Sequence, residues 1–227
     1  MSETGIRKLV IVGGGTAGWI AAASFSRLLG NRLTIELVES EAIGTVGVGE
    51  ATIPQIIRLN TILGLDENDF LKSTYGTFKL GIEFVNWGQL GDSYLHTFGD
   101  AGLNLANVHF HHYWRRHAQA GSDKDLWHYS LHKLAADQRR FAKLDGIGNT
   151  AMTGLAYAYH FDASLYAAYL RKYAEGRGVT RTEGIVESVA RDGESGDIRS
   201  ITLEDGTQVD GDFFIDCTGF RSILLGQ

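Results

Sequence analysis

The chain has 227 residues, enough for one large domain or two small ones, and 44% of them are apolar while 21% are charged. This composition excludes a disordered or collagen-like chain, and the net charge of −6 argues against a general nucleic-acid binder. The single cysteine, Cys217, cannot form an internal disulfide, and no apolar run approaches the roughly 20 residues of a membrane span. With an N-terminus that lacks a signal-peptide pattern, these features predict a cytoplasmic protein that binds neither nucleic acid nor membrane.

The first forty residues have the pattern of a strand–helix–strand unit. The β-branched run Lys8–Val12 ends in glycines, and the alanine-rich segment Ala17–Leu29 after it favours a helix. Leu33–Val38 then predicts a second strand. Such a unit is typical of a parallel sheet, so the expected fold class is α/β.

The middle of the chain mixes short helices with one expected strand. A proline in the first turn suits a helix over Pro54–Leu63, and Asp66 can cap the helix that follows. Thr77–Trp87 alternates between apolar and polar residues, which predicts a single strand with Lys79 and Glu83 on its exposed face. Three later segments have helical patterns: 104–120, 130–143 and 163–175.

The C-terminal part is rich in strand patterns. Asp162 is available as the N-cap of the helix over 163–175. The Asp205-Gly206 pair predicts a hairpin turn. Strands are expected at Gly184–Arg191, Ile198–Leu203, Gln208–Val209 and Phe213–Asp216.

A glycine-rich turn separates the first predicted strand from the first helix. Its sequence, GGGTAG, reads G-x-G-x-x-G, in which the first glycine makes a tight turn, the second lets the backbone approach a pyrophosphate, and the third lets helix pack on strand. The helix N-terminus then presents free N–H groups to the phosphates. We expect cofactor contacts from Gly13, Gly15, Thr16, Ala17 and Gly18.

Glu39 ends the second strand, 21 residues after Gly18, where a carboxylate accepts hydrogen bonds from ribose hydroxyls and disfavours the 2′-phosphate of NADP. A glycine turn without a ligand is the alternative interpretation. The segment Asp212–Gly219 ends in Thr-Gly and resembles the strand of two-dinucleotide-domain flavoproteins whose final glycine lies beside the cofactor. That likeness favours FAD over NAD and adds Gly219 to the expected site, although a plain buried strand would have a similar pattern.

Several stretches together resemble the flavin-dependent tryptophan halogenase family. These are GGGTAGWIAAA (13–23), GVGEATIP (47–54), FKLGIEFVNW (78–87), HFDASLYAAYLRKYAEGRGV (160–179) and FIDCTGFRSILL (214–225). The resemblance implies a Rossmann-like FAD-binding module with helical and strand insertions. The module is expected at about 1–76 and 160–227, with a substrate-side insertion at about 77–159. The resemblance further implies that the chain corresponds to the N-terminal half of such an enzyme.

The resemblance also assigns roles to individual residues. Lys79 matches the catalytic lysine of the family, and the H-x-F-G segment, here at a shorter spacing, places His96 and Phe98 in the aromatic substrate pocket. A strap against the flavin would comprise Gly47, Val48, Gly49, Glu50 and Ala51.

The chemistry implied by the resemblance needs reduced FAD from a separate reductase, O2 and a halide. Together they yield hypohalous acid, which moves to Lys79 while an electron-rich ring such as tryptophan or indole attacks the halogen. Lys79 either forms a haloamine, which requires the neutral amine and hence a pKa lowered by burial, or holds the acid by hydrogen bonding. Both roles stay open.

Other interpretations accompany this one. Without the resemblance, Lys79 is interpreted as a lysine on the exposed face of a strand, either solvated or in a surface ion pair with Glu83. An FAD monooxygenase or another flavin oxidoreductase shares the glycine loop, and an FAD-binding fragment without turnover is a further alternative. No metal site is expected, because the histidines lack supporting carboxylates; helix packing in the interior or at an interface is favoured for His109, His111, His112 and His117. A homodimer is one open assembly state.

Overall fold

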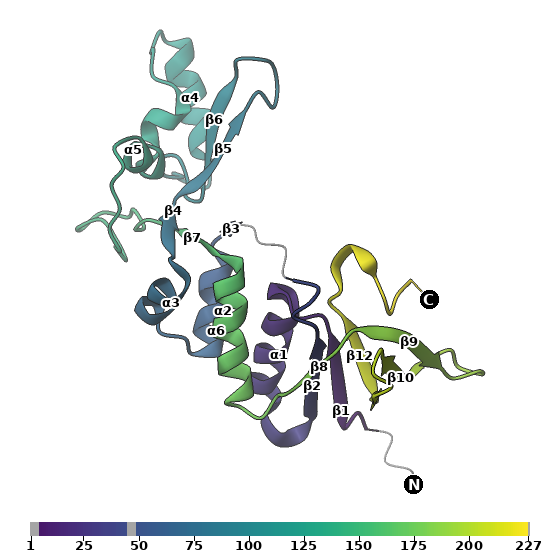
Figure 1. Cartoon of the computed structure of the whole chain (residues 1–227). Helices are drawn as coiled ribbons and strands as arrows, with labels where there is room; N and C mark the ends of the chain where they lie inside the picture. Colours follow the sequence, from purple (N-terminus) through teal and green to yellow (C-terminus); the bar gives the residue numbers. More distant parts are fainter. Residues whose placement is uncertain (1–4, 45–48, 227) are drawn as a thin grey trace. The chain divides into compact units, whose positions relative to one another are not determined.

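The computed structural model describes residues 5–44 and 49–226, and it divides into two compact units (Figure 1). The first unit comprises Met1–Glu50, Asn60–Gly76 and Phe161–Gln227, and the second comprises Ala51–Leu59 and Thr77–His160. The chain therefore crosses between the units after residues 50, 59, 76 and 160.

A four-stranded parallel sheet forms the centre of the first unit. Its strand order is β12-β1-β2-β8, formed by Phe213–Asp216, Lys8–Val12, Thr34–Glu39 and Thr180–Glu183. The apolar residues of β1 are 0–3% exposed, as expected for a central parallel strand. The predicted α/β class is confirmed. The edge strand β8 was not predicted, because its sequence TRTE is polar and half exposed.

Helices cover one face of this sheet. The helix α1 (Thr16–Leu29) packs on β1 and β2, and α6 (Ala163–Glu175) packs on α1 (Figure 1). The expected cap of α6 is confirmed, because Asp162 Oδ1 accepts a hydrogen bond from the backbone N–H of Leu165 at 2.9 Å. The helix α3 (Glu67–Thr74) packs on α6 and is capped by Asp66, as predicted.

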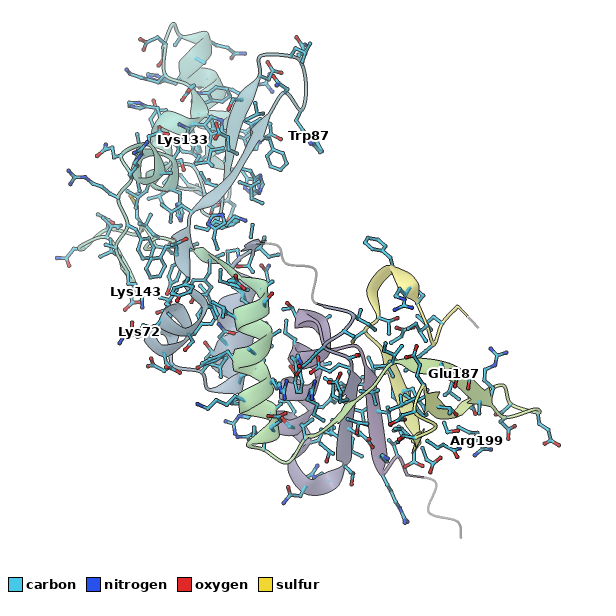
Figure 2. The ribbon with its side chains drawn as sticks, viewed as in Figure 1. Lys72, Trp87, Lys133, Lys143, Glu187 and Arg199 are labelled. Atoms are coloured by element: carbon cyan, nitrogen blue, oxygen red, sulfur yellow. The ribbon has the colours of Figure 1, made fainter. Side chains whose placement is uncertain are left out.

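An antiparallel meander packs against the other face. It consists of β9 (Val186–Arg191), β10 (Ile198–Leu203) and β11 (Gln208–Asp210), with Gly206 in the predicted turn at φ 84°. Figure 2 shows Glu187 and Arg199 on this meander. Its apolar residues join β1 and β2 in one core cluster, formed by Val10, Val12, Val38, Ile201, Leu203, Val209 and Leu224.

The second unit holds two antiparallel strand pairings, and here one strand prediction is wrong. The segment Thr77–Trp87 forms two strands with Leu80 between them: β4 (Thr77–Lys79) pairs with β7 (Ala158–Asp162), and β5 (Gly81–Val85) pairs with β6 (Ser93–Thr97). Because the chain changes sheets at Leu80, alternation along the segment does not describe one sheet face. The short strand β3 (Gly49–Ala51) completes the sheet order β3-β7-β4.

The helices between these strands are shorter than predicted. The helix α4 (Phe110–Gln119) starts late because Ala106 and Asn107 have positive φ angles in a turn. The helix α5 (Leu131–Asp137) ends early, two residues before Arg139 at φ 53°. The remaining helical segments are α2 (Gln55–Leu63) and the 3₁₀ turns η1 (Gly30–Arg32), η2 (Leu126–Tyr129) and η3 (Gly219–Arg221). None of the described helices combines the length and apolar character that a bilayer crossing requires.

Candidate functional site

The glycine loop lies where the carboxyl ends of three parallel strands meet in the first unit. Gly13 follows β1 at φ 115°, and its N–H donates a hydrogen bond to the Val38 carbonyl of β2 at 2.8 Å. A Cβ on Gly13 would lie 2.3 Å from the carbonyl oxygen of Cys217, which follows β12. Only glycine fits this position, and the loop is thereby fixed against the ends of β2 and β12.

Two other glycines of the loop face different surroundings. A Cβ on Gly18 would lie 1.8 Å from the Gly13 carbonyl oxygen, so the absence of a side chain lets α1 approach the loop. A Cβ on Gly15 would meet no atom within 4 Å. Gly15 is also the N-cap of α1, whose first turn, beginning with Thr16 and Ala17, contains no acidic residue. Open space beside free helix N–H groups suits a pyrophosphate.

Two other expected cofactor residues, Glu39 and Gly219, lie at or beyond the carboxyl ends of β2 and β12. The Glu39 carboxylate lies over the loop, since its Oε2 is 1.3 Å from where a Cβ on Gly14 would be. Gly219 begins the turn η3 at φ 62°, two residues after Cys217. The Asp216 carboxylate organises this turn by accepting the N–H of Leu224 at 2.8 Å. The loop, Glu39 and Gly219 thus come together as a group that fits a dinucleotide.

The expected flavin strap is described only in part. Gly47 and Val48 lie outside the described residues. Gly49, Glu50 and Ala51 form β3.

Lys79 ends β4 in the second unit, and its side chain is enclosed. Only 6% of the residue is exposed, so its interpretation as a lysine on a wet strand face is wrong. Its Nζ donates a hydrogen bond to the Thr52 carbonyl at 2.8 Å and lies 5.5 Å from the centroid of the Phe98 ring. Glu83 instead accepts a hydrogen bond from Ser93. Burial lowers the pKa of Lys79 below its ordinary value, which favours the neutral amine.

The carbonyl that holds Lys79 is itself fixed, a feature that the sequence did not reveal. The backbone N–H and the hydroxyl of Thr52 both donate to the Tyr159 carbonyl, at 3.0 and 2.9 Å, and the Tyr159 N–H donates back to the hydroxyl at 3.1 Å. Thr52 is therefore clamped to β7. The aromatic alternation of residues 157–161 was the signal for this strand.

The two expected substrate residues flank the end of β6 and have different neighbours. Phe98 faces the Lys79 amine, and its N–H donates to the Leu80 carbonyl at 3.0 Å. His96 is exposed on β6 and contacts the Phe84 ring edge-on at 6.5 Å. The structure therefore brings Phe98, but not His96, into the described surroundings of the Lys79 amine.

A buried histidine on α5, His132, packs against Gly99 of the H-x-F-G segment. His132 is 4% exposed, and its ring fills the space beside Gly99, where a Cβ would lie 1.9 Å from Cε1. Its Nε2 accepts the Ala156 N–H at 2.8 Å, so the neutral ring carries its proton on Nδ1. Among the described residues, Nδ1 has no hydrogen-bond partner. Burial lowers the pKa of His132, although the charge of Asp100 opposes that shift.

This burial makes stability depend on pH. The unfolded chain takes up a proton on His132 near pH 6.5, whereas the folded protein does so only at lower pH, so the free energy of unfolding should fall as pH drops below about 6.5. The slope contributed by this one proton is at most about 1.4 kcal/mol per pH unit. His132→Gln, which keeps an acceptor for Ala156, should flatten the curve in urea unfolding from pH 7.5 to 5. His117→Gln, at an exposed histidine, should not; equal slopes for wild type and His132→Gln would contradict the assignment.

The histidines of α4 do not pack in an interior. His109, His111, His112 and His117 are exposed, with the His111 and His112 ring centroids 4.0 Å apart, so of the two predicted kinds of packing the interior one does not occur. Packing at an interface stays a prediction. Within residues 5–44 and 49–226, no three His, Cys, Asp or Glu residues are grouped as a metal site would require.

Comparison with known proteins bears on the whole chain. Residues 8–227 match the family model of the tryptophan halogenases. The curated tryptophan 7-halogenase RebH of Lentzea aerocolonigenes is 35% identical over 98% of this chain. That alignment covers 44% of RebH, so the chain spans less than half the length of this relative.

Solved structures agree with the sequence match. A flavin-dependent halogenase from Xanthomonas campestris superposes with a TM-score of 0.89 at 48% identity, covering 98% of this chain and 44% of that one. The flavin-dependent halogenase BrvH from Brevundimonas sp. BAL3 superposes with a TM-score of 0.90 at 40% identity, covering 99% of this chain and 45% of that one. With a family match over nearly its whole length, the chain belongs to the tryptophan halogenase family.

Proposed function

We propose that the protein is a halogenase that uses reduced FAD to install chloride or bromide on an electron-rich aromatic such as tryptophan or indole. The observation that carries the proposal is the enclosed Lys79 amine, held by the Thr52 carbonyl and facing the Phe98 ring. The similar proteins named as flavin-dependent halogenases support it. A separate flavin reductase, O2, a halide and a cytoplasmic location are parts of the same proposal.

The residues of the first unit fit the cofactor. The loop from Gly13 to Gly18 would hold the pyrophosphate against the N-terminus of α1, because Gly15 leaves that approach open. Glu39 would bind the adenosine ribose, and Gly219 would lie beside the cofactor. When bound, reduced FAD with O2 and halide supplies hypohalous acid.

Lys79 is the residue that reacts with the hypohalous acid or binds it by a hydrogen bond. Its Nζ has one hydrogen committed to the Thr52 carbonyl, which fixes the direction of the remaining hydrogens and of the lone pair when the amine is neutral. The neutral amine can take the halogen from hypohalous acid: the N–halogen bond forms, the O–halogen bond breaks, and the oxygen leaves as water with a proton from the amine. The ammonium can instead donate a hydrogen bond to the hypohalous oxygen and polarise the acid. A neighbouring aromatic ring such as Phe98 suits the binding of a flat aromatic substrate.

The test combines the intact protein with a flavin reductase, NADH, FAD and air, and supplies bromide or chloride with tryptophan or indole. We expect mass spectrometry to find a monohalogenated product that requires both reduced flavin and halide. Omitting the halide is the control. An oxygenated product that forms without halide would instead identify a monooxygenase, and flavin binding without any product would contradict the proposed turnover.

A further inference from the structure

Arg181 contacts the carboxylate expected to bind the cofactor ribose. It lies on β8, which pairs in parallel with β2 so that Leu37 is opposite Arg181 and Glu39 is opposite Glu183. This register places Arg181 diagonally across from Glu39. Its Nε donates to Glu39 Oε1 at 2.6 Å, and the two side chains are only 14% and 13% exposed.

The two oxygens of the Glu39 carboxylate have separate surroundings. Oε1 is held by Arg181, while Oε2 lies over Gly14, at 1.3 Å from where a Cβ would be. Among the residues that the structure describes, no hydrogen-bond donor reaches Oε2. The carboxylate is therefore held through Oε1, while Oε2 keeps its lone pairs for a hydroxyl donor.

Glu39 lies beside two other carboxylates, so its orientation depends on a cation that offsets their repulsion. Glu41 and Glu183 are neighbours of Glu39, and a second guanidinium nitrogen of Arg181, Nη2, contacts both of them, with Glu41 Oε1 at 3.1 Å. One guanidinium thus gathers three carboxylates that would otherwise repel one another. Arg171 is more distant, with its Nη1 at 3.8 Å from Glu39 Oε1. Arg181 is the cation that fixes the direction of the Glu39 carboxylate.

We propose that Arg181 is a positioning residue for the cofactor: it orients Glu39 so that Oε2 accepts a hydrogen bond from the 2′-hydroxyl of the adenosine ribose. This inference rests on the proposed binding of FAD. The fixed orientation of Glu39 makes the site specific for a ribose rather than a deoxyribose. When the 2′-hydroxyl is missing, the buried acceptor Oε2 is left without a hydrogen bond. The alternative is an ion pair that only joins β2 to β8.

The test compares binding of FAD with binding of its analogue built on 2′-deoxyadenosine, followed by the change in flavin fluorescence. Wild type should bind FAD at least about tenfold more tightly than the analogue, the effect of one hydrogen bond to a charged group. In Arg181→Met this ratio should fall to near 1, mainly through weaker FAD binding. Arg181→Lys, which keeps the charge without the planar fork, should give an intermediate ratio and guards against loss of folding in the first variant.

Two further variants complete the design. Arg171→Met removes the more distant arginine and should keep the wild-type ratio. Glu39→Gln should lower the ratio, and adding it to Arg181→Met should change nothing more, because coupled residues act non-additively. If Arg181→Met kept the wild-type ratio of affinities for FAD and the analogue, even with lower stability in urea, the proposal would be wrong. Arg181 would then only form an ion pair that joins β2 to β8.

The outcomes also separate this inference from the proposed function. Wild type that binds FAD but does not distinguish the analogue would overturn the role of Arg181 while leaving flavin binding intact. Wild type that binds neither flavin would overturn the proposed function as well.

Discussion

Replacing Lys79 with methionine should abolish halogenation, lowering kcat by about 1,000-fold, which is within the range found when a catalytic acid, base or nucleophile is removed. Methionine has a similar length and stays apolar beside Phe98, but it offers neither a lone pair of useful basicity nor a hydrogen-bond donor. Flavin affinity should fall far less than kcat, because the glycine loop expected to hold the pyrophosphate makes no contact with Lys79 among the described residues. Single-turnover halogenation and an FAD titration measure the two quantities.

The matched control is Lys143→Met. Lys143 is in the same unit and its Nζ also lies over an aromatic ring, 5.7 Å from the Phe78 centroid, but it is exposed (Figure 2). It should retain activity. If Lys79→Met still halogenated at the wild-type rate, Lys79 would not be the catalytic residue.

A second variant of the same residue separates its two chemical roles. Lys79→Arg keeps a cation and hydrogen-bond donors but cannot become a neutral amine, since a guanidinium stays protonated in proteins. Activity retained in part by Lys79→Arg would favour polarisation of hypohalous acid by hydrogen bonding. An inactive but folded Lys79→Arg would favour the haloamine, which the lowered pKa of Lys79 also favours.

Gly15→Ala and Gly18→Ala should both abolish tight flavin binding, but for different reasons. At Gly15 the new methyl group meets no atom of the protein, so stability should stay within about 0.5 kcal/mol of wild type while the methyl blocks the pyrophosphate. At Gly18 the methyl would lie 1.8 Å from the Gly13 carbonyl oxygen, so α1 must move and stability should fall by about 1–3 kcal/mol. For both we expect FAD affinity to fall more than about 100-fold, or about 2.7 kcal/mol.

Urea unfolding without flavin, together with flavin titration, distinguishes these two variants. Gly30→Ala provides a control for alanine substitution itself, since Gly30 follows α1 at φ 55°, far along the helix from the loop, and its Cβ would meet nothing within 4 Å. It should cost some stability through backbone strain but leave FAD affinity intact. Wild-type FAD binding by Gly15→Ala would show that the loop is not the pyrophosphate site.

Sequence patterns predicted the elements that are fixed by local signals. The strand Lys8–Val12 is a β-branched run followed by glycines. The sequence marks both ends of α6, with Asp162 as its N-cap and Gly176 as its C-cap. The edge strand β8 escaped prediction because solvent on one side removes the need for apolar residues. The break at Leu80 escaped because the alternation continues across the change of sheets.

The residues of the candidate site were likewise predicted only where a local sequence signal marks them. The loop and Glu39 were predicted because their spacing is part of one local motif. The Thr52 carbonyl was not, because a backbone acceptor has no side-chain signature. Arg181 was missed because it meets Glu39 across 142 residues of sequence, through a strand pairing that no local pattern encodes. The burial of Lys79 depends on the same kind of distant pairing, between β4 and β7.

The position of β12 beside β1 has a consequence for how this protein is made. The Lys8 N–H donates to the Asp212 carboxylate 204 residues later, so one edge of the central strand has no partner until β12 has left the ribosome. At about 5–20 residues per second, synthesis keeps that edge unpaired for about 10–40 s. An unpaired apolar strand edge is a site for aggregation. Added chaperones, and a lower growth temperature that weakens hydrophobic association of this edge, should therefore raise the soluble yield more than a stabilising change elsewhere in the fold.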